Sequence, residues 1–260
     1  MIHRPPSNNA AARTASITRP KSIVSTASVR LWTRLAMSGA SQVPDRKSSD
    51  GDVPCRRGDA ALPSRVRRRR GPEANQVISA HHHSFFKGHE IRERCWPVGP
   101  IESRLPGFYV HEVGPGPRLQ GWTYLSVGLW SAVHGVDGHG LEFLLSAPQR
   151  DDRLVELMTM VGYYHAGPST QHLDLGHTMP IGEPWLPHSQ CDNYVVSLPY
   201  LYGPDLETCN WEDGHARHLW LLPITQAELD FKVANGLETL EQRFDEAAIL
   251  PTDPLRESVV

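Results

Sequence analysis

Histidine is the residue of this chain that most strongly suggests chemistry, because thirteen of its fourteen histidines lie between His81 and His218. Neutral imidazole is a zinc ligand and a general base. Metal sites need ligands at a fixed spacing, such as H-E-x-x-H on a helix. The consecutive His81, His82 and His83 point to different sides of any regular element. The spacing therefore predicts polar loop histidines, with no metal and no cofactor. A small metal-dependent hydrolase that uses loop histidines remains the alternative.

Two further residues could serve as nucleophiles. Ser126 lies in a Y-L-S-V-G run that lacks the first glycine of a nucleophile elbow, and the run has the pattern of a strand. Cys191 follows His188 by three residues, but the partners of a catalytic cysteine come from distant parts of the chain. The sequence therefore predicts no catalytic residue.

Large aromatic side chains suggest a different activity, namely binding to another protein. Trp185, Trp211, Tyr200 and Tyr202 fall in segments rich in Pro and Gly. Aromatic residues in exposed loops are frequent anchors of interfaces. The sequence predicts a partner-binding surface that contains Trp185, His188, Tyr202 and Trp211. The alternative is that these rings pack back onto the sheet.

The elements that must position these residues follow from periodicity. Alternating runs predict strands at residues 108–113, 122–130, 141–146, 194–198 and 218–222, with a short strand within 175–190. The second and third of these form a hairpin. Helical spacing predicts helices at residues 151–165, 225–234 and 237–247. Thr225 and Glu228 form a capping box at the start of the second helix. The order of elements predicts an α+β fold with a mixed, mostly antiparallel β-sheet flanked by α-helices.

Charge divides the chain into two parts. Residues 1–75 hold fifteen Lys and Arg and five acids, a net charge near +10, and the remainder is near −13. The first part has a single aromatic residue, Trp32, and buries too little apolar area to offset chain entropy. We therefore expect a disordered basic extension over residues 1–75 and one folded domain over residues 76–260.

The extension allows several interpretations. The arginine run at residues 65–70 could hold nucleic acid or an anionic membrane electrostatically, and a solvated tail is the alternative. Residues 10–40 loosely fit an organelle transit peptide, and a true start at Met37 would make the early residues a gene-model extension.

Cysteine usage and hydropathy bear on the compartment. The four cysteines are widely spaced and form no C-x-x-C pair. No run approaches the roughly 20 apolar residues of a membrane span, and no secretory signal is present. These features favour a reduced cytoplasmic protein without membrane contact. They do not predict an oligomeric state.

Several motifs in a fixed order resemble one family. Residues 122–129 and 138–143 are similar to an aromatic strand with S-x-G followed by G-x-G-x-E-[FL]. Residues 154–165 resemble the helix that follows, and residues 175–177 its turn. Pro223-Ile224-Thr225 lies in a segment similar to L-x-P-I-T-x-x-E, and residues 253–260 resemble D-x-x-R-x-S-[VL]. This is the pattern of the suppressor of fused (SUFU) domain.

The resemblance implies a SUFU-like domain of the single-domain bacterial type. It implies a non-enzymatic domain that binds another protein. Animal members have a second domain, so their two-domain clamp is not carried over. Some bacterial members are thought to be immunity proteins that neutralise toxins, and an acidic folded part suits a basic toxin as partner.

Overall fold

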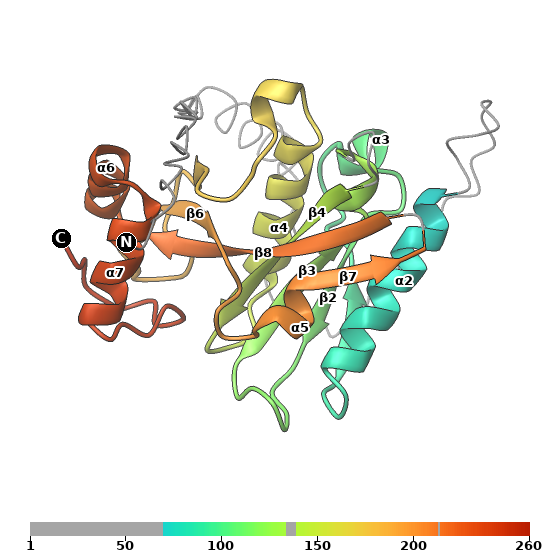
Figure 1. Ribbon diagram of the computed structural model, residues 1–260, viewed down its shortest axis with the longest axis horizontal. Coiled ribbons are helices and arrows are strands. Elements are labelled where there is room, and N and C mark those ends of the chain that lie inside the picture. The colour runs from blue at the N-terminus through green and yellow to red at the C-terminus, as the bar shows by residue number, and fades with distance from the viewer. Residues whose placement is uncertain (1–69, 134–138, 213) are drawn as a thin grey trace, which may run out of the picture.

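The computed structural model describes residues 70–133, 139–212 and 214–260 (Figure 1). Most of the predicted basic extension lies outside these residues, as does the tip of the Gly-rich turn at residues 134–138. The first described element is a helix that begins at Arg70, so ordered structure crosses the boundary expected at residue 75.

The strands of the described part form one sheet. They are β1 (Ile91–Arg94), β2 (Tyr109–Val113), β3 (Trp122–Val127), β4 (His139–Ala147), β5 (Thr178–Pro180), β6 (Asn193–Ser197), β7 (Thr208–Trp211) and β8 (Gly214–Ile224). Their order is β1-β2-β3-β4-β8-β6-β5, and β7 pairs with the first half of β8. Every pairing is antiparallel except that of β4 with β8.

Helices flank this sheet. The α-helices are α2 (Arg70–Phe85), α3 (Ile101–Arg104), α4 (Asp152–His165), α5 (Pro204–Glu207), α6 (Gln226–Asn235) and α7 (Leu237–Glu246), and the 3-10 turns are η2 (Leu129–Ser131) and η3 (Ser169–Gln171). A mixed, mostly antiparallel sheet with flanking helices confirms the predicted α+β fold. None of the helices that the structure describes is long and apolar enough to cross a membrane.

Strand alternation divides the core into layers, because successive side chains point to opposite faces. On β4, Leu144 packs in a cluster with Leu125 and Trp220, whereas Phe143 and Leu145 belong to a cluster on the other face. The sheet is therefore buried on both sides, which explains why its strands read as nearly continuous apolar runs.

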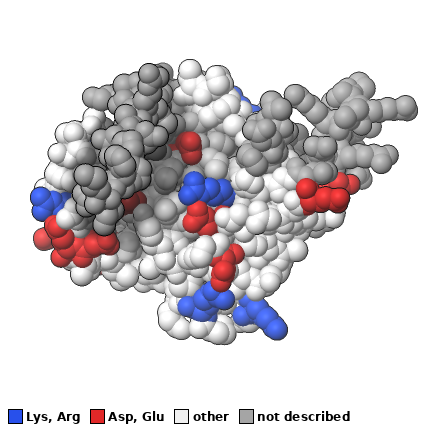
Figure 2. All heavy atoms as spheres, viewed as in Figure 1, with Lys and Arg blue, Asp and Glu red and all other residues white. Residues whose placement is uncertain are grey.

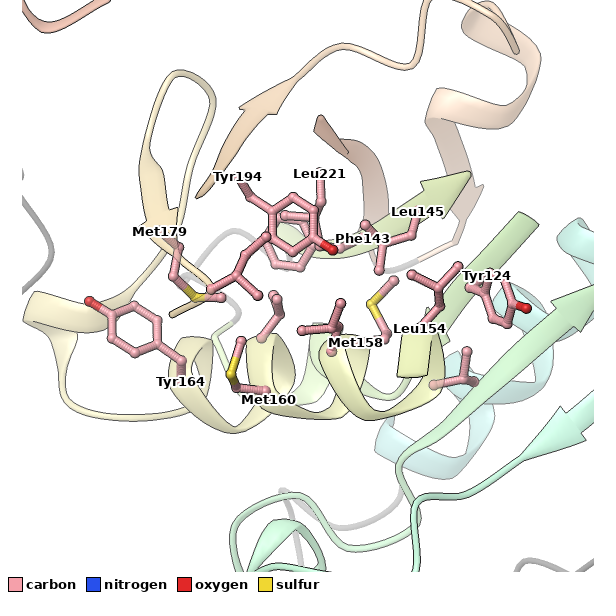
Figure 3. Packing of buried hydrophobic residues seen from close by; sticks show 14 of the residues in the cluster. Tyr124, Phe143, Leu145, Leu154, Met158, Met160, Tyr164, Met179, Tyr194 and Leu221 are labelled. Carbon is pink, nitrogen blue, oxygen red and sulfur yellow. The ribbon is translucent and has the colours of Figure 1, made fainter. Parts of the chain in front are cut away.

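Helix α4 covers the face that carries Phe143. Figure 3 shows Leu154 and Met158 of this helix pointing toward the side chains of the sheet, with Leu154 beside Tyr124 and Leu145. The Asp151 carboxylate accepts a hydrogen bond from the Arg153 backbone N–H at 2.9 Å and caps the helix. The predicted start of this helix is confirmed.

Helices α2 and α7 cover the opposite face. Ala74 and Ile78 of α2 pack near Val127, and Leu240 and Phe244 of α7 pack in the cluster that holds Trp220 and Leu144. Helix α2 is not among the predicted elements. Its pattern is obscured because it carries three consecutive histidines.

The C-terminal segment is held by a buried ion pair. The Arg256 guanidinium donates to both carboxylate oxygens of Glu228, at 2.6 and 2.7 Å, and to the Pro223 carbonyl at 2.8 Å. Glu228 also accepts from the Thr225 backbone N–H at 2.8 Å, so the predicted capping box is confirmed. Strand β8, helix α6 and the chain end are thus tied at one carboxylate.

One predicted boundary is wrong for a local reason. The strand expected over residues 122–130 ends at Val127, and the chain turns into η2. Gly128 has φ +114°, which side-chain-bearing residues rarely adopt. The turn brings the backbone N–H groups of Gly128 and Trp130 to the Glu142 carboxylate, each at 3.0 Å.

Candidate functional site

Five of the thirteen histidines between His81 and His218 meet where helix α2 packs on the sheet. His82 of α2 is fully buried and lies between His111 of β2 and His218 of β8. Its Nδ1 is 3.0 Å from His111 Nδ1, and its Nε2 is 2.8 Å from His218 Nε2. His81 stacks on His218, and His83 approaches His111 edge-on. The interpretation as polar loop histidines is wrong for these residues, which lie on one helix and two strands.

Burial makes these rings neutral. Burial, followed by the neighbouring His218 and His111, lowers the pKa of His82 well below its usual value. Burial, followed by His83, lowers the pKa of His111 to about 4. Burial likewise lowers the pKa of His218 to about 3. The three rings form a neutral hydrogen-bonded chain at physiological pH.

The chain has the wrong geometry for a single metal ion. Both ring nitrogens of His82 form hydrogen bonds to the rings of His111 and His218. The nitrogen lone pairs of the three rings therefore do not point to one common position, as ligands of a single metal ion must. Over the residues with described positions, no group of three or more His, Cys, Asp or Glu side chains could hold a metal ion. The arrangement offers no support for the hydrolase alternative.

The candidate nucleophiles are engaged in structural contacts. The Ser126 hydroxyl donates to the Glu142 carboxylate at 2.5 Å and accepts from the Phe143 backbone N–H at 2.8 Å. Burial raises the pKa of Glu142 to about 7, against the opposing effect of the Ser126 hydrogen bond. Cys191 is buried, and burial raises the pKa of its thiol. A raised thiol pKa disfavours the nucleophilic thiolate.

Two of the four predicted interface residues are buried. Trp185 is 0% exposed, and its indole N–H donates to the Ser189 hydroxyl at 2.9 Å. Tyr202 is buried, and its hydroxyl lies 2.9 Å from Thr123 Oγ1 and 2.6 Å from Ser146 Oγ. The expectation that these rings are exposed is wrong, because each packs onto the sheet and satisfies its polar atom there.

The other two interface residues reach the surface. His188 is exposed and adopts φ +67°. Trp211 is half-buried, with its ring edge-on to Trp130 at 5.1 Å between centroids. The structure therefore does not bring the four predicted residues together as one exposed patch. A binding role for His188 and Trp211 stays a prediction.

Trp185 gives a test of this correction. We expect Trp185→Phe to lower the free energy of unfolding by about 1–3 kcal/mol, because it leaves a small cavity and removes one of the two hydrogen bonds that the Ser189 hydroxyl accepts. Urea unfolding followed by circular dichroism measures the change. The matched substitution Trp211→Phe should have a smaller effect, below about 1 kcal/mol, since that ring is only half-buried. Equal effects would contradict the structural role of Trp185.

A surface that the aromatic pattern did not locate lies at the end of the molecule formed by α6 and α7. Most of the large apolar side chains that are exposed in the described part lie on α6, in the segment after α7 or in the loop at residues 200–201: Tyr200, Leu201, Val233, Leu250, Leu255 and Val260. We call these residues the C-terminal face. Tyr200 is joined to α7, since its hydroxyl donates to the Glu241 carboxylate at 3.0 Å.

The C-terminal face is also acidic. Residues 226–260 contain eight acids and three bases, and one of those bases, Arg256, is buried against Glu228. Figure 2 shows acidic side chains gathered at the left end of the molecule, over α7. Glu238, Asp245 and Glu246 are exposed there. Exposed apolar side chains among like charges are typical of an interface with a partner of opposite charge.

Comparison with known proteins identifies the family. The family model described as Suppressor of fused protein (SUFU) matches residues 103–257. The crystal structure of a SUFU homologue from Neisseria gonorrhoeae is 34% identical, with a TM-score of 0.63, and the match covers 73% of this chain and 98% of that chain. The chain belongs to the suppressor of fused family.

More distant SUFU structures share the fold. The Sufu–Fu complex matches with 15% identity and a TM-score of 0.52, over 66% of this chain and 84% of that chain. Drosophila Suppressor of Fused matches with 14% identity and a TM-score of 0.53, over 73% of this chain and 51% of that chain. This chain thus spans about half the length of the Drosophila protein. A search of curated proteins finds no match.

Several residues of the motifs that indicated the SUFU family form buried contacts that stabilise the fold of this domain. Ser126 and Glu142 fasten the turn after β3, and Glu228 and Arg256 fasten the chain end to α6. Because both sets are buried, they identify the fold but present no surface to a partner. Family motifs therefore could not locate a binding site.

Proposed function

We propose that this SUFU domain binds another protein through its C-terminal face and catalyses no reaction. One observation carries the proposal: exposed apolar side chains coincide with an excess of exposed acids around α6 and α7. The crystal structure of the Sufu–Fu complex supports it, because a protein with the same fold forms a complex there.

The charge suggests the class of partner. The surface near α7 offers Glu238, Glu241, Asp245 and Glu246, with Arg243 as the basic neighbour that pairs with Glu246. Such a surface suits a basic protein with apolar side chains at the centre of its interface. We propose a cytoplasmic immunity protein that neutralises a basic toxin, such as a nuclease, by covering its cationic surface.

A pair of charge reversals tests the proposal. Glu238→Lys with Asp245→Lys places two cations on the C-terminal face and should weaken partner binding tenfold or more, because the approaching partner is also cationic. The partner is first recovered on the immobilised full chain at low salt. Its affinity for each variant is then measured by calorimetry with purified proteins.

A matched control carries the same change of charge elsewhere. Glu73→Lys with Glu90→Lys alters two exposed acids at α2 and beside β1, away from α6 and α7. Binding by this control should stay within about twofold of the original. An equal loss of partner affinity in both double variants would show that the overall charge of the chain causes the loss. That result would contradict the proposed surface. Failure to recover any specific partner at low salt would contradict the function itself.

The immunity role has its own test. Co-expression with a toxin encoded by a neighbouring gene should restore growth of the host cell, and the Glu238→Lys, Asp245→Lys pair should restore it less well. Growth inhibition that persists in the presence of the unmodified chain would contradict the role as an immunity protein while leaving protein binding intact.

A further inference from the structure

The histidine chain joins three elements that are distant in the sequence. His82 lies on α2, His111 on β2 and His218 on β8, and 136 positions separate the first from the last. These contacts lie on the sheet face under α2, between the apolar contacts of Ile78 and those of Phe85. Imidazole rings therefore form a polar centre in the attachment of α2 to the sheet, beside the contacts of His81 with the Leu206 carbonyl and of the Cys209 thiol with the Val77 carbonyl.

Each link of the histidine chain is a hydrogen bond between two ring nitrogens. Each N···N contact holds one proton, which one ring donates and the other accepts. Three neutral rings supply these protons, and the chain can run in either direction from His111 to His218. A further proton on His82 would let both of its nitrogens donate to the neighbouring rings, but it would place a positive charge on a ring that is 0% exposed, and burial of an uncompensated charge is unfavourable.

Titratable and charged groups around His82 do not compensate such a charge. Helix α2 adds His81 and His83, both of which disfavour a further cation on His82. On β2, the ring of Tyr109 lies beside His111. On β8, Arg217 faces the Glu207 carboxylate of α5 at 2.7 Å.

One buried carboxylate lies on the neighbouring strand. Glu142 of β4 is the register partner of His218, but its oxygens accept from the Ser126 hydroxyl and from the backbone N–H groups of Gly128 and Trp130. On β1, the exposed Glu93 is the register partner of His111. In the described ranges, the hydrogen bonds of the His82 ring go to the other two imidazoles and to no carboxylate. The nearest charges therefore cannot hold a protonated His82 in place.

We propose that the histidine chain is an acid-sensitive latch, which holds α2 on the sheet at neutral pH and releases it when the chain takes up a proton. A protonated His82 is more stable in water than in the apolar site. Because His81, His82 and His83 are consecutive residues of α2, the helix must move away from the sheet when the His82 ring leaves. The opening is local, since α4 and the C-terminal segment have their own contacts on other parts of the sheet. This inference is independent of the proposed binding surface.

Hydrogen–deuterium exchange on the full chain at pH 7.5 and pH 5.5 tests the latch. After correction for the intrinsic pH dependence of exchange, the amides of residues 76–86 should exchange at least tenfold faster at pH 5.5. Those of residues 152–165 should keep their protection. A parallel loss of protection in both helices, or none in α2, would overturn the proposal.

Variants separate the latch from general acid sensitivity. In His82→Gln, which cannot be protonated at position 82 but can still donate and accept, the acceleration of exchange from α2 at pH 5.5 should be clearly smaller than in the original chain, because only His111 and His218 remain to take up protons. His82→Asn serves the same purpose if the glutamine variant does not fold. The matched control is His165→Gln, which removes a buried histidine on α4 and should leave the acid response of α2 unchanged. An α2 response as large in His82→Gln as in the original chain, or one that disappears in His165→Gln, would overturn the proposal.

Discussion

Replacing Arg256 with methionine is expected to lower the free energy of unfolding by about 3–5 kcal/mol. The substitution removes the guanidinium that pairs with both oxygens of Glu228, and it leaves that carboxylate buried without a counter-charge. The side chains of Arg256 and Glu228 are 4% and 0% exposed, so water cannot replace the lost partner. Urea unfolding at neutral pH measures the effect.

Two variants show that the loss comes from the unpaired charge. Arg243→Met removes an exposed ion pair with Glu246, and it should change stability by less than about 0.5 kcal/mol. The double substitution Glu228→Met, Arg256→Met removes both buried charges and should recover a large part of the stability. If Arg256→Met costs no more than Arg243→Met, the account of the chain end as a buried lock is wrong.

Acidification from pH 7 to pH 5 is expected to destabilise the domain by roughly 5 kcal/mol, a large part of the stability of a typical domain. Burial lowers the pKa of His82, of His111 to about 4, and of His165 and His218 to about 3. The unfolded chain therefore binds protons below pH 6.5 that the folded domain does not bind. The resulting stability is complete above pH 6.5 and is lost as the pH falls toward the folded pKa values.

The size of the effect follows from these shifts. At pH 5 each of the four histidines contributes a loss of about 2 kcal/mol, because pH 5 lies about 1.5 units below the ordinary pKa. Glu142 acts in the opposite direction. Its folded pKa of about 7 means that the folded state gains about 2 kcal/mol relative to the unfolded state as the pH falls from 7 to 5.

Urea unfolding at pH 7, 6 and 5 checks this balance. The variant His165→Gln should lose about 2 kcal/mol less over the same interval, because its share of the linkage is absent. The His165 Nδ1 accepts a hydrogen bond from the Leu173 backbone N–H at 2.9 Å, and glutamine can supply an acceptor there. A stability that rises between pH 7 and pH 5 would contradict the assignment of these histidines as buried and neutral.

Local signals in the sequence predict much of the fold. The hairpin of β3 and β4 follows from two alternating runs on either side of a Gly-rich turn, and its antiparallel register is observed. Asp151 and Thr225 mark the starts of α4 and α6, because a cap is a contact within one turn of the helix. These features depend on residues close together in the chain, which is why periodicity and capping rules find them.

Features that depend on contacts between residues far apart in the sequence were not predicted. The alignment of His82 with His218 arises only when α2 packs across the sheet, and no spacing within the sequence encodes it. Trp185 lies in a Pro-rich segment that has the composition of an exposed loop, yet its ring packs in the core. The C-terminal face also combines the loop at Tyr200 with α7, and Glu241 contacts that loop only in the folded chain.

Site-specific photo-crosslinking in cells tests the central claim most directly. The photoreactive residue p-benzoylphenylalanine replaces Tyr200 on the C-terminal face or, in a matched control, Val98, an exposed apolar residue that follows β1 at the opposite edge of the sheet. We expect position 200 to crosslink a discrete basic protein that position 98 does not. Crosslinking of that protein from position 98 alone, or from neither position, would contradict a binding surface around α6 and α7.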